Sequence, residues 1–271
     1  MKIGIVGHGV VGSAMARFFR KQPKHEVMIY DKFRSPYDGI NQKSAVNCCD
    51  VVFICVPTPT AEDGFSCDLS AVEECVEWIE PPMCLRSTVV PGTVDQLSLK
   101  TGKSLSFSPE YLGENPSHPW HEEGACGFLV IGGPSELCDL VVSAYSEVPD
   151  GARRFFRTTA RTAELCKYME NCFLATKVAF VNQFYDIAAA FDVNFDELRD
   201  LWLADPRVGL SHSVVTEERG FRGRCLPKDL AAMVAVMRVR GEAPLLAAVL
   251  EYNTRLCQLA DQRRAASKMQ S

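Results

Sequence analysis

The sequence predicts an α/β fold in which a parallel-sheet domain is followed by an all-helical domain. Short β-rich runs alternate with helix-like stretches up to about residue 158, which is the pattern of successive βαβ units. A glycine-rich turn follows the first run, and long helical stretches replace the alternation beyond residue 158. We therefore expect two domains, over residues 1–158 and 159–271.

The β-rich runs define the expected strands of the first domain. These strands are predicted at residues 2–6, 26–30, 51–56, 83–90, 105–108, 127–131 and 153–157. The helix-like stretches among them include residues 11–21 and 134–145. Strands that alternate with helices in this way are expected to form a parallel sheet.

Four long stretches predict the helices of the second domain. They are residues 160–191, 195–203, 227–240 and 243–268. A loop punctuated by proline and glycine, from Pro206 to Gly223, separates the second stretch from the third. The last stretch is apolar on much of its surface near its start, so we expect it to pack against another helix.

The composition excludes several classes of function. The chain has 34 acidic and 29 basic residues and a formal net charge of −5, which argues against a nucleic-acid partner. No apolar run approaches the roughly 20 residues that span a bilayer, so we expect no membrane insertion. The amino terminus does not resemble a signal peptide, and the 12 cysteines are scattered without a CxxC pair. Both observations favour a cytoplasmic protein with mostly buried free thiols.

The glycine-rich turn at residues 7–12 has the spacing GxGxxG, between a predicted strand and a predicted helix. Its glycines permit a tight turn, a close approach to a pyrophosphate and close packing of helix on strand, as in Rossmann-like domains. Asp31 ends the next strand, where an acidic side chain holds ribose hydroxyls and favours NAD over NADP. The basic residues Lys32 and Arg34 nearby leave NADP open.

Cys225 lies just before a predicted helix whose first residue is Pro227, a residue favoured in the first turn. The helix dipole and the neighbouring Arg222, Arg224 and Lys228 favour a thiolate, so we expect a lowered thiol pKa. Taken alone, this segment is compatible either with a nucleophile or with a capped structural loop.

Lys167 and Asn171 are one turn apart on a predicted helix and share a face with Glu164. This stripe lines a site or is simply a solvated face. Glu110 and Glu114 follow a predicted strand end, where open α/β sheets present catalytic groups, and either carboxyl is suited to proton transfer.

A histidine-containing segment near residue 120 also suggests metal binding. Its candidate ligands are His118, His121, Glu122 and Glu123. The two histidines lack a third ligand at a characteristic spacing, so we expect a surface loop and no metal.

Seven motifs occur in order along the chain. They are GIVGHGVVG (4–12), CVPTPT (55–60), STVVPGT (87–93), SPEYLGE (108–114), AELCKYMEN (163–171), DPRVG (205–209) and GFRGRCLPKD (220–229). With these motifs the chain resembles the UDP-glucose/GDP-mannose 6-dehydrogenase family. The resemblance implies NAD-dependent oxidation of a nucleotide sugar's primary alcohol to the uronic acid, by two successive hydride transfers.

The resemblance also implies roles for individual residues. Cys225 would attack the intermediate aldehyde and carry a thiohemiacetal and then a thioester, which water hydrolyses. Glu110 would manage the hydrolytic water, with support from Thr88 and Asp229. Lys167 and Asn171 would stabilise negative charge on the substrate oxygen.

Further contacts follow from the same resemblance. The implied NAD contacts are Gly7, Gly9, Val10, Val11, Gly12, Asp31, Val56, Pro57, Thr58, Thr88 and Glu114. The implied substrate contacts are Arg207, Gly223 and Lys228, with Arg207 reaching the substrate of a neighbouring subunit. The last helix would form the core of a homodimer.

Two departures from the family's pattern stand out. Family members normally continue into a second α/β domain that grips the nucleotide, and we expect this UDP-binding domain to be absent here. Arg222 stands where the family usually has glycine, which would strain the loop if that position needs a positive φ. We expect Arg222 and Arg224 to help bind a substrate phosphate.

Two alternative functions remain open. One is a two-electron NAD-dependent dehydrogenase of a smaller hydroxylated substrate, for which Cys225 would be dispensable. The other is a non-catalytic NAD-binding protein.

Overall fold

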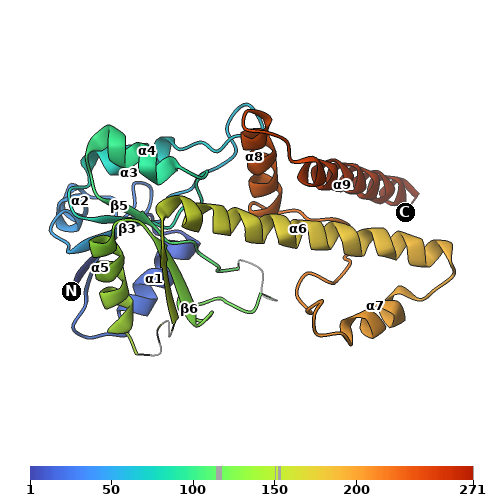
Figure 1. Cartoon of the computed structure of the whole chain (residues 1–271), viewed down its shortest axis with the longest axis horizontal. Coiled ribbons are helices and arrows are strands. Elements are labelled where there is room, and N and C mark those ends of the chain that lie inside the picture. The colour runs from blue at the N-terminus through green and yellow to red at the C-terminus, as the bar shows by residue number, and fades with distance from the viewer. Residues whose placement is uncertain (114–117, 150, 152–153, 271) are drawn as a thin grey trace. The chain divides into compact units, whose positions relative to one another are not determined.

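The computed structural model describes residues 1–113, 118–149, 151 and 154–270. The chain divides into two compact units (Figure 1). The first comprises Met1–Pro59 and Cys67–Lys167, and the second comprises Thr60–Ser66 and Tyr168–Ser271. Helix α6 (Ala160–Ala190) begins in the first unit and ends in the second. The domain boundary expected at residue 158 stays a prediction.

A seven-stranded sheet forms the centre of the first unit, in the order β2-β1-β3-β4-β5-β6-β7. The strands are β1 (Lys2–Val6), β2 (Glu26–Tyr30), β3 (Val51–Ile54), β4 (Met83–Leu85), β5 (Leu105–Phe107), β6 (Phe128–Gly132) and β7 (Arg154–Thr158). The chain leaves β1 first toward one edge and then toward the other, which creates the switch point where α/β proteins bind ligands. The predicted α/β class with a Rossmann-like sheet is confirmed.

The sheet departs from the expected all-parallel arrangement at one place. Strands β5 and β6 pair antiparallel, with Phe107 opposite Gly132, while all other neighbouring strands are parallel. Parallel neighbours need a crossover connection, usually a helix. The described residues between β5 and β6 form no helix, so the chain returns in the opposite direction.

Helices cover both faces of this sheet (Figure 1), and an apolar cluster lies on each face. On one face, Ile3 and Phe53 pack with residues of α1 (Val10–Phe19) and α5 (Ser135–Ser146). On the other, Val52 and Ile54 pack with residues of α2 (Ile40–Val46), α3 (Ser70–Trp78) and α4 (Thr93–Thr101). Successive strand residues point to opposite faces, which explains why these four strand residues divide between the clusters.

Helices α2, α3 and α4 were not individually predicted from the sequence. They have seven to nine residues and bury at most three side chains each. A helix that buries so few residues has little apolar periodicity, which is the main sequence signal for helices.

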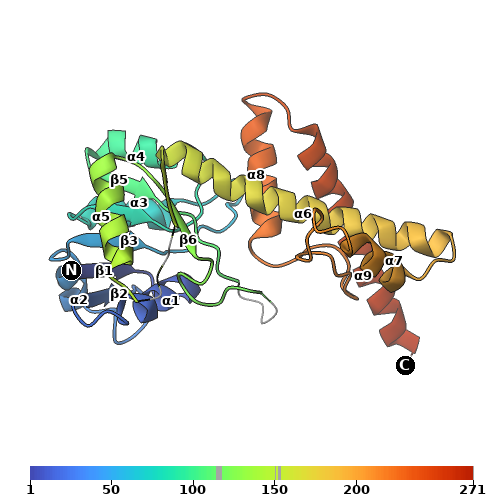
Figure 2. The same cartoon turned by 60° about the horizontal axis from the view of Figure 1, so that its bottom comes forward.

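The second unit consists of helices, with no strand among its described residues. Besides most of α6, it contains α7 (Phe195–Leu203), α8 (Leu226–Arg238) and α9 (Pro244–Gln270). Helices α8 and α9 contact each other (Figure 2). All four predicted helices are confirmed, with ends that differ by at most two residues from the expected ones.

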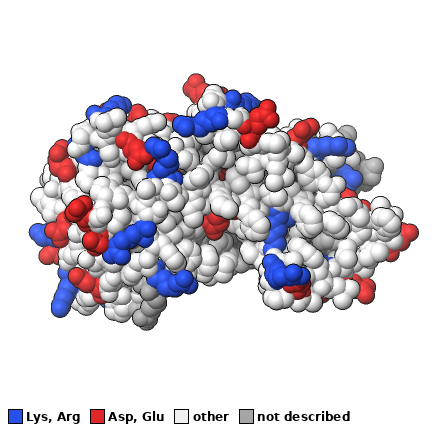
Figure 3. Space-filling model, viewed as in Figure 1, with Lys and Arg blue, Asp and Glu red and all other residues white. Residues whose placement is uncertain are grey.

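The distribution of charged side chains on the surface agrees with the small net charge of the sequence. On the face shown in Figure 3, basic and acidic side chains are interspersed, as expected from the small net charge.

None of the described helices combines the length and apolar character that a bilayer-spanning segment requires. All twelve cysteines are free thiols.

Candidate active site

The glycine turn after β1 has the geometry that its spacing predicts. Gly7 has a φ of +90°, and a Cβ there would lie 2.7 Å from the carbonyl oxygen of Cys55. A Cβ on Gly12 would collide with the carbonyl oxygen of Gly7, whereas a Cβ on Gly9 would meet nothing within 4 Å. Gly9 also precedes α1 without any side-chain cap. The turn therefore leaves room and backbone donors for a pyrophosphate at the start of α1.

Asp31, after β2, is bonded to this turn. Its Oδ2 accepts a hydrogen bond of 2.7 Å from the His8 backbone N–H, and its Oδ1 accepts one of 2.9 Å from that of Phe33. Each carboxylate oxygen has about two acceptor sites, so both retain capacity for ribose hydroxyls. Arg34 donates to the His8 carbonyl at 2.9 Å, and Lys32 pairs with Glu74 at 2.9 Å. Because both basic side chains have local partners, the carboxylate dominates this position and fits NAD.

The loops after β3 and β4 are joined by side-chain bonds. The hydroxyl of Thr58 donates to the Thr88 carbonyl at 2.7 Å, and the hydroxyl of Ser87 donates to the Val56 carbonyl at 2.6 Å. These strands are parallel neighbours, so the predicted cofactor residues of both loops lie at the same edge of the sheet. Val10 and Val11 are the first residues of α1. Glu114, also predicted to contact the cofactor or substrate, lies outside the described residues.

Glu110 and Lys167 form a polar centre within the first unit. Burial raises the pKa of the Glu110 carboxyl above its usual 4.5, while the positive charge of Lys167 acts in the opposite direction. The Leu112 backbone N–H donates to this carboxyl at 2.8 Å. The Lys167 ammonium is buried and lies 5.0 Å from the centre of the Tyr111 ring. A raised pKa brings a carboxyl closer to the pKa that favours general acid–base catalysis at neutral pH.

Glu164 does not belong to a polar stripe with Lys167 and Asn171, as the sequence had suggested. Its carboxylate is fully buried and accepts hydrogen bonds from the backbone N–H groups of Gly92 and Val94. These donors lie at the beginning of α4, where helices have unpaired N–H groups. Glu164 therefore caps α4 rather than lining a site.

A second polar centre lies within the helical unit. The side-chain amide of Asn171 donates to Asp229 at 2.5 Å, and the Lys228 ammonium contacts the other oxygen of Asp229 at 2.6 Å. Asn171 and Asp229 are both almost completely buried. Asp229 is in the first turn of α8, and the cap residue of that helix is Cys225.

Cys225 is exposed at the N-terminus of α8. Its carbonyl accepts the backbone N–H of Asp229 at 2.9 Å, which closes the first turn. The helix begins at Leu226, one residue earlier than predicted, and Pro227 follows in the first turn. This is a position where a helix dipole favours a thiolate.

Two buried asparagines that sequence reasoning missed hold the loop before Cys225. The Oδ1 of Asn182 accepts from Arg219 Nε at 2.9 Å and from the Gly220 N–H at 3.2 Å. Asn253 pairs with both backbone groups of Phe221, at 2.8 and 3.0 Å. A buried asparagine on an otherwise apolar helix face was the available signal, because such an amide requires hydrogen-bond partners.

The strain expected at Arg222 is not found. Among described residues, the non-glycine positions with positive φ are Asp192, His212 and Arg219. The guanidinium of Arg222 is bonded to Asp261 at 3.0 Å. This bond to α9 counts against the expectation that Arg222 binds a substrate phosphate.

Two further predicted substrate contacts, Arg207 and Gly223, lie in exposed loops. Arg207 is exposed and pairs with Asp205 at 2.9 Å. The loop residues that follow Arg207 are held by Lys177. Its ammonium donates to the carbonyls of Val208 and Gly209 at 2.8 and 2.6 Å. Burial lowers the pKa of Lys177.

The segment first considered for metal binding requires one correction. No cluster of three His, Cys, Asp or Glu side chains suited to a metal ion occurs in the described part of the chain. Glu123, however, is not on a surface loop. Its side chain is 5% exposed and forms a salt bridge of 2.9 Å with Arg86.

Comparisons with known proteins match two segments of the chain. Residues 38–144 match the NAD binding domain of the UDP-glucose/GDP-mannose dehydrogenase family, and residues 161–255 match its central domain. GDP-mannose 6-dehydrogenase of Pseudomonas aeruginosa is 28% identical over 96% of this chain and 70% of its own length. UDP-glucose 6-dehydrogenase of Rickettsia prowazekii is 30% identical over 68% of this chain, but that match spans only 44% of the relative.

A solved structure of a UDP-glucose dehydrogenase is similar to this chain as well. The UDP-glucose dehydrogenase of Pyrobaculum islandicum superimposes with a TM-score of 0.79 at 25% identity. The match covers 94% of this chain and 68% of that one. The chain is therefore similar over nearly its whole length to a part of these longer proteins.

Proposed function

The chain belongs to the UDP-glucose/GDP-mannose dehydrogenase family, and from that premise we propose that it uses NAD to oxidise the C6 alcohol of a nucleotide sugar to the uronic acid. The observation that carries the proposal is the start of α8. There an exposed Cys225 precedes Asp229 by one turn, and Asp229 is held by Asn171. A non-catalytic nucleotide-binding protein would not need this arrangement.

NAD would be held at the glycine turn and at the carboxyl edge of the sheet. The residues proposed to contact it are Gly7, Gly9, Val10, Val11, Gly12, Asp31, Val56, Pro57, Thr58 and Thr88. The open space at Gly9 and the acceptor sites of Asp31 support this assignment. NAD supplies the acceptor for the hydride that each oxidation removes.

The first oxidation removes a hydride and a proton from the alcohol carbon and oxygen. Lys167 and Asn171 are proposed to donate hydrogen bonds to the substrate oxygen as negative charge develops on it. Donors fixed before the charge appears stabilise the transition state without reorganisation. The buried ammonium of Lys167 and the buried amide of Asn171 support this role.

The second oxidation is proposed to take place on Cys225. Its thiolate attacks the aldehyde carbon, and the resulting thiohemiacetal loses a second hydride to become a thioester. Water then cleaves the C–S bond, with Glu110 as the base that takes a proton from the water and Thr88 and Asp229 as supporting groups. The balance is one alcohol, two NAD⁺ and one water giving one carboxylate, two NADH and three protons.

The remaining assignments are also proposals. Arg207, Gly223 and Lys228 contact the substrate, and the active form is a cytoplasmic homodimer. Large apolar side chains exposed on the second unit support self-association, including Phe173 at 64%, Phe191 at 76% and Leu245 at 66%. Light scattering that gives a monomer mass at micromolar concentration would reject the dimer.

The decisive experiment counts NADH formed per sugar consumed, with a panel of UDP- and GDP-sugars. Two NADH per sugar establish the four-electron oxidation and identify the substrate. One NADH per sugar establishes a two-electron dehydrogenase instead. No NADH from a protein that binds NAD by calorimetry excludes the proposal for this panel and favours a non-catalytic role.

A further inference from the structure

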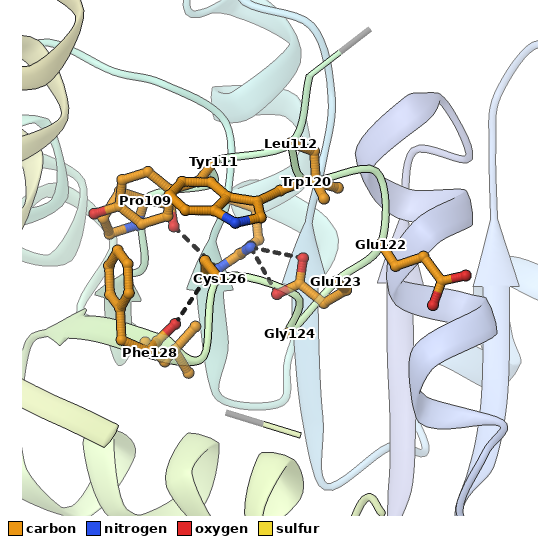
Figure 4. Close-up of a pocket in the computed structure, with 11 residues that line it drawn as sticks. Pro109, Tyr111, Leu112, Trp120, Glu122, Glu123, Gly124, Cys126 and Phe128 are labelled. Carbon is orange, nitrogen blue, oxygen red and sulfur yellow. Dashed lines mark hydrogen bonds and ion pairs between the residues drawn. The ribbon is translucent and has the colours of Figure 1, made fainter. Parts of the chain in front are cut away.

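A buried arginine connects two loops at the carboxyl edge of the sheet in the first unit. Arg86, directly after β4, is 2% exposed. Its Nη1 donates to the Ser108 hydroxyl at 2.7 Å and to the Pro109 carbonyl at 3.3 Å. Its Nη2 donates to both oxygens of Glu123, at 2.9 and 3.0 Å (dashed lines in Figure 4). Tyr145 donates a further hydrogen bond of 2.6 Å to Glu123.

The cavity beside this cluster is too small for a substrate. Its lining includes the aromatic rings of Tyr111, Trp120 and Phe128 (Figure 4). Its volume of about 10 Å³ is close to the minimum that admits one water molecule. The cluster therefore does not form a binding pocket of its own.

Stability alone does not account for the cluster either. Moving an arginine and a glutamate out of water is costly, so a buried ion pair often contributes no more than an apolar substitute would. The Nε of Arg86 is buried without a hydrogen-bond partner among the described residues, which adds to the cost. What the arginine does provide is a fixed geometry, because a guanidinium donates in fixed directions.

The two loops joined by Arg86 carry two proposed catalytic residues. Strands β4 and β5 are parallel neighbours, with Leu85 opposite Phe107, so their following loops begin side by side. Thr88 lies two residues beyond Arg86, and Glu110 lies two residues beyond Ser108. Thr88 and Glu110 therefore each lie two residues after a residue of the Arg86–Ser108 hydrogen bond.

We propose that Arg86 is a positioning residue for Glu110: its guanidinium, held by Glu123, fixes the backbone at Ser108 and Pro109 from which the Glu110 side chain projects. The inference rests on the proposed function, because the role of Glu110 in thioester hydrolysis comes from there. Arg86 itself touches no substrate in this proposal.

The charged groups around Glu110 also affect the pKa of its carboxyl. Burial raises the pKa of the Glu110 carboxyl, the positive charges of Lys167 and Arg86 lower it, and the negative charge of Glu123 raises it. The Cys55 thiol also interacts with Glu110, and burial keeps this thiol neutral by raising its pKa. Removing the negative charge of Glu123 should therefore lower the pKa of Glu110, and removing the positive charge of Arg86 should raise it.

The test uses Arg86→Lys and Glu123→Gln in the full chain, with Glu122→Gln as the matched control. Glu122 is the adjacent exposed glutamate, which pairs with Lys21 at the surface. NMR of ¹³C-glutamate-labelled protein, assigned with Glu110→Gln, follows the Glu110 titration without any need for turnover. Hydrogen exchange of the Leu112 amide reports whether its bond to Glu110 persists, and the core amide of Val52 reports on the fold as a whole.

Arg86→Lys keeps the positive charge but loses the forked donors that reach Ser108, Pro109 and Glu123 together. We therefore expect faster exchange at Leu112 and a changed Glu110 pKa, with exchange at Val52 unchanged. In Glu123→Gln we expect a lowered Glu110 pKa, and in Glu122→Gln no change. With substrate, Arg86→Lys should keep the first burst of NADH and the KM, while steady-state turnover falls by up to about 10²-fold, the cost of misplacing a catalytic group by 1 Å.

A folded Arg86→Lys protein with unchanged Glu110 titration and Leu112 exchange would overturn the proposal, as would an equal response in the Glu122→Gln control. If Arg86→Lys does not fold, the isosteric Glu123→Gln decides by hydrogen exchange of the Leu112 amide. That exchange should be faster than in the wild type, because the Arg86 guanidinium loses the carboxylate that holds it, and unchanged exchange would overturn the proposal. A wild-type protein that makes no NADH would refute the proposed function, while the NMR experiment would still test the positioning by Arg86.

Discussion

The side-chain amide of Asn171 on α6 donates a hydrogen bond of 2.5 Å to the carboxylate of Asp229 on α8. The two residues are 58 positions apart and belong to two different motifs of the sequence. Both are almost completely buried, at 4% and 1% exposure. The bond therefore fixes the first turn of α8, which begins next to Cys225, against the long helix α6.

Asn171→Ala should destabilise the fold by about 1–3 kcal/mol, because it leaves a buried oxygen of Asp229 without its donor. Chemical denaturation measures this change. Gln183→Ala, an exposed substitution on the same helix, is the control and should leave the free energy of unfolding within about 0.5 kcal/mol of the wild type. Equal stabilities for the two variants would show that the Asn171–Asp229 bond contributes nothing.

Cys225→Ser should prevent the second oxidation, since a serine hydroxyl is a far weaker nucleophile than a thiolate. We expect at most one NADH per sugar from this variant, together with free aldehyde. Cys166→Ser, which changes another exposed cysteine, should still give two NADH per sugar. Two NADH per sugar from Cys225→Ser would rule out covalent catalysis at this position.

Glu110 should give activity and stability opposite dependences on pH. Burial raises the pKa of its carboxyl above 4.5, so the base form appears, and thioester hydrolysis accelerates, as pH rises through the raised value. A group whose pKa is raised by folding stabilises the fold at low pH and loses that contribution as pH rises.

Glu110→Gln therefore should lose the rise in activity but become more stable than the wild type from about pH 4.5 upward, with the gain levelling off above the raised pKa. Thermal unfolding and steady-state rates across this pH range measure both effects. Glu122→Gln should show neither, because an exposed bond to Lys21 lowers the pKa of Glu122. A constant stability difference between Glu110→Gln and wild type would contradict the assignment.

Gly7→Ala should abolish NAD binding and destabilise the fold, because alanine at a φ of +90° is strained and its Cβ would lie 2.7 Å from a backbone oxygen of Cys55. Calorimetric titration with NAD measures the first effect. Gly64→Ala is a matched control, since Gly64 has a φ of +76° but open space at its Cβ. It should cost only the backbone strain, of about 1–2 kcal/mol, and leave NAD binding intact.

Arg222→Gly should leave the KM for the sugar unchanged. The Arg222 guanidinium is bonded to Asp261 and to the backbone carbonyls of Glu218 and Cys257, so its charge is already neutralised on α9. Steady-state kinetics with the sugar identified above check this outcome. A KM raised tenfold or more would restore the idea that Arg222 binds a substrate phosphate.

Many secondary-structure elements and turns of this protein are determined by short segments of the sequence. Strand runs, the glycine turn at residues 7–12 and the proline after Cys225 depend on backbone preferences within a few residues. These features therefore predicted the α/β class, the four long helices and the start of α8 to within two residues. The glycine spacing and Asp31 likewise predicted a dinucleotide turn whose geometry the structure shows.

Other features depended on which distant side chains folding brings together. Glu123 was expected on a surface loop but is buried against Arg86, and Glu164 was expected beside Lys167 but caps α4. The roles of Asn182 and Asn253 in holding the loop before Cys225 were not foreseen. A buried polar group must find its partner wherever the packed chain provides one, and that partner is often tens of residues away. For this reason the sequence determined the elements and the reactive residue types, while only the tertiary structure decided how these residues are held.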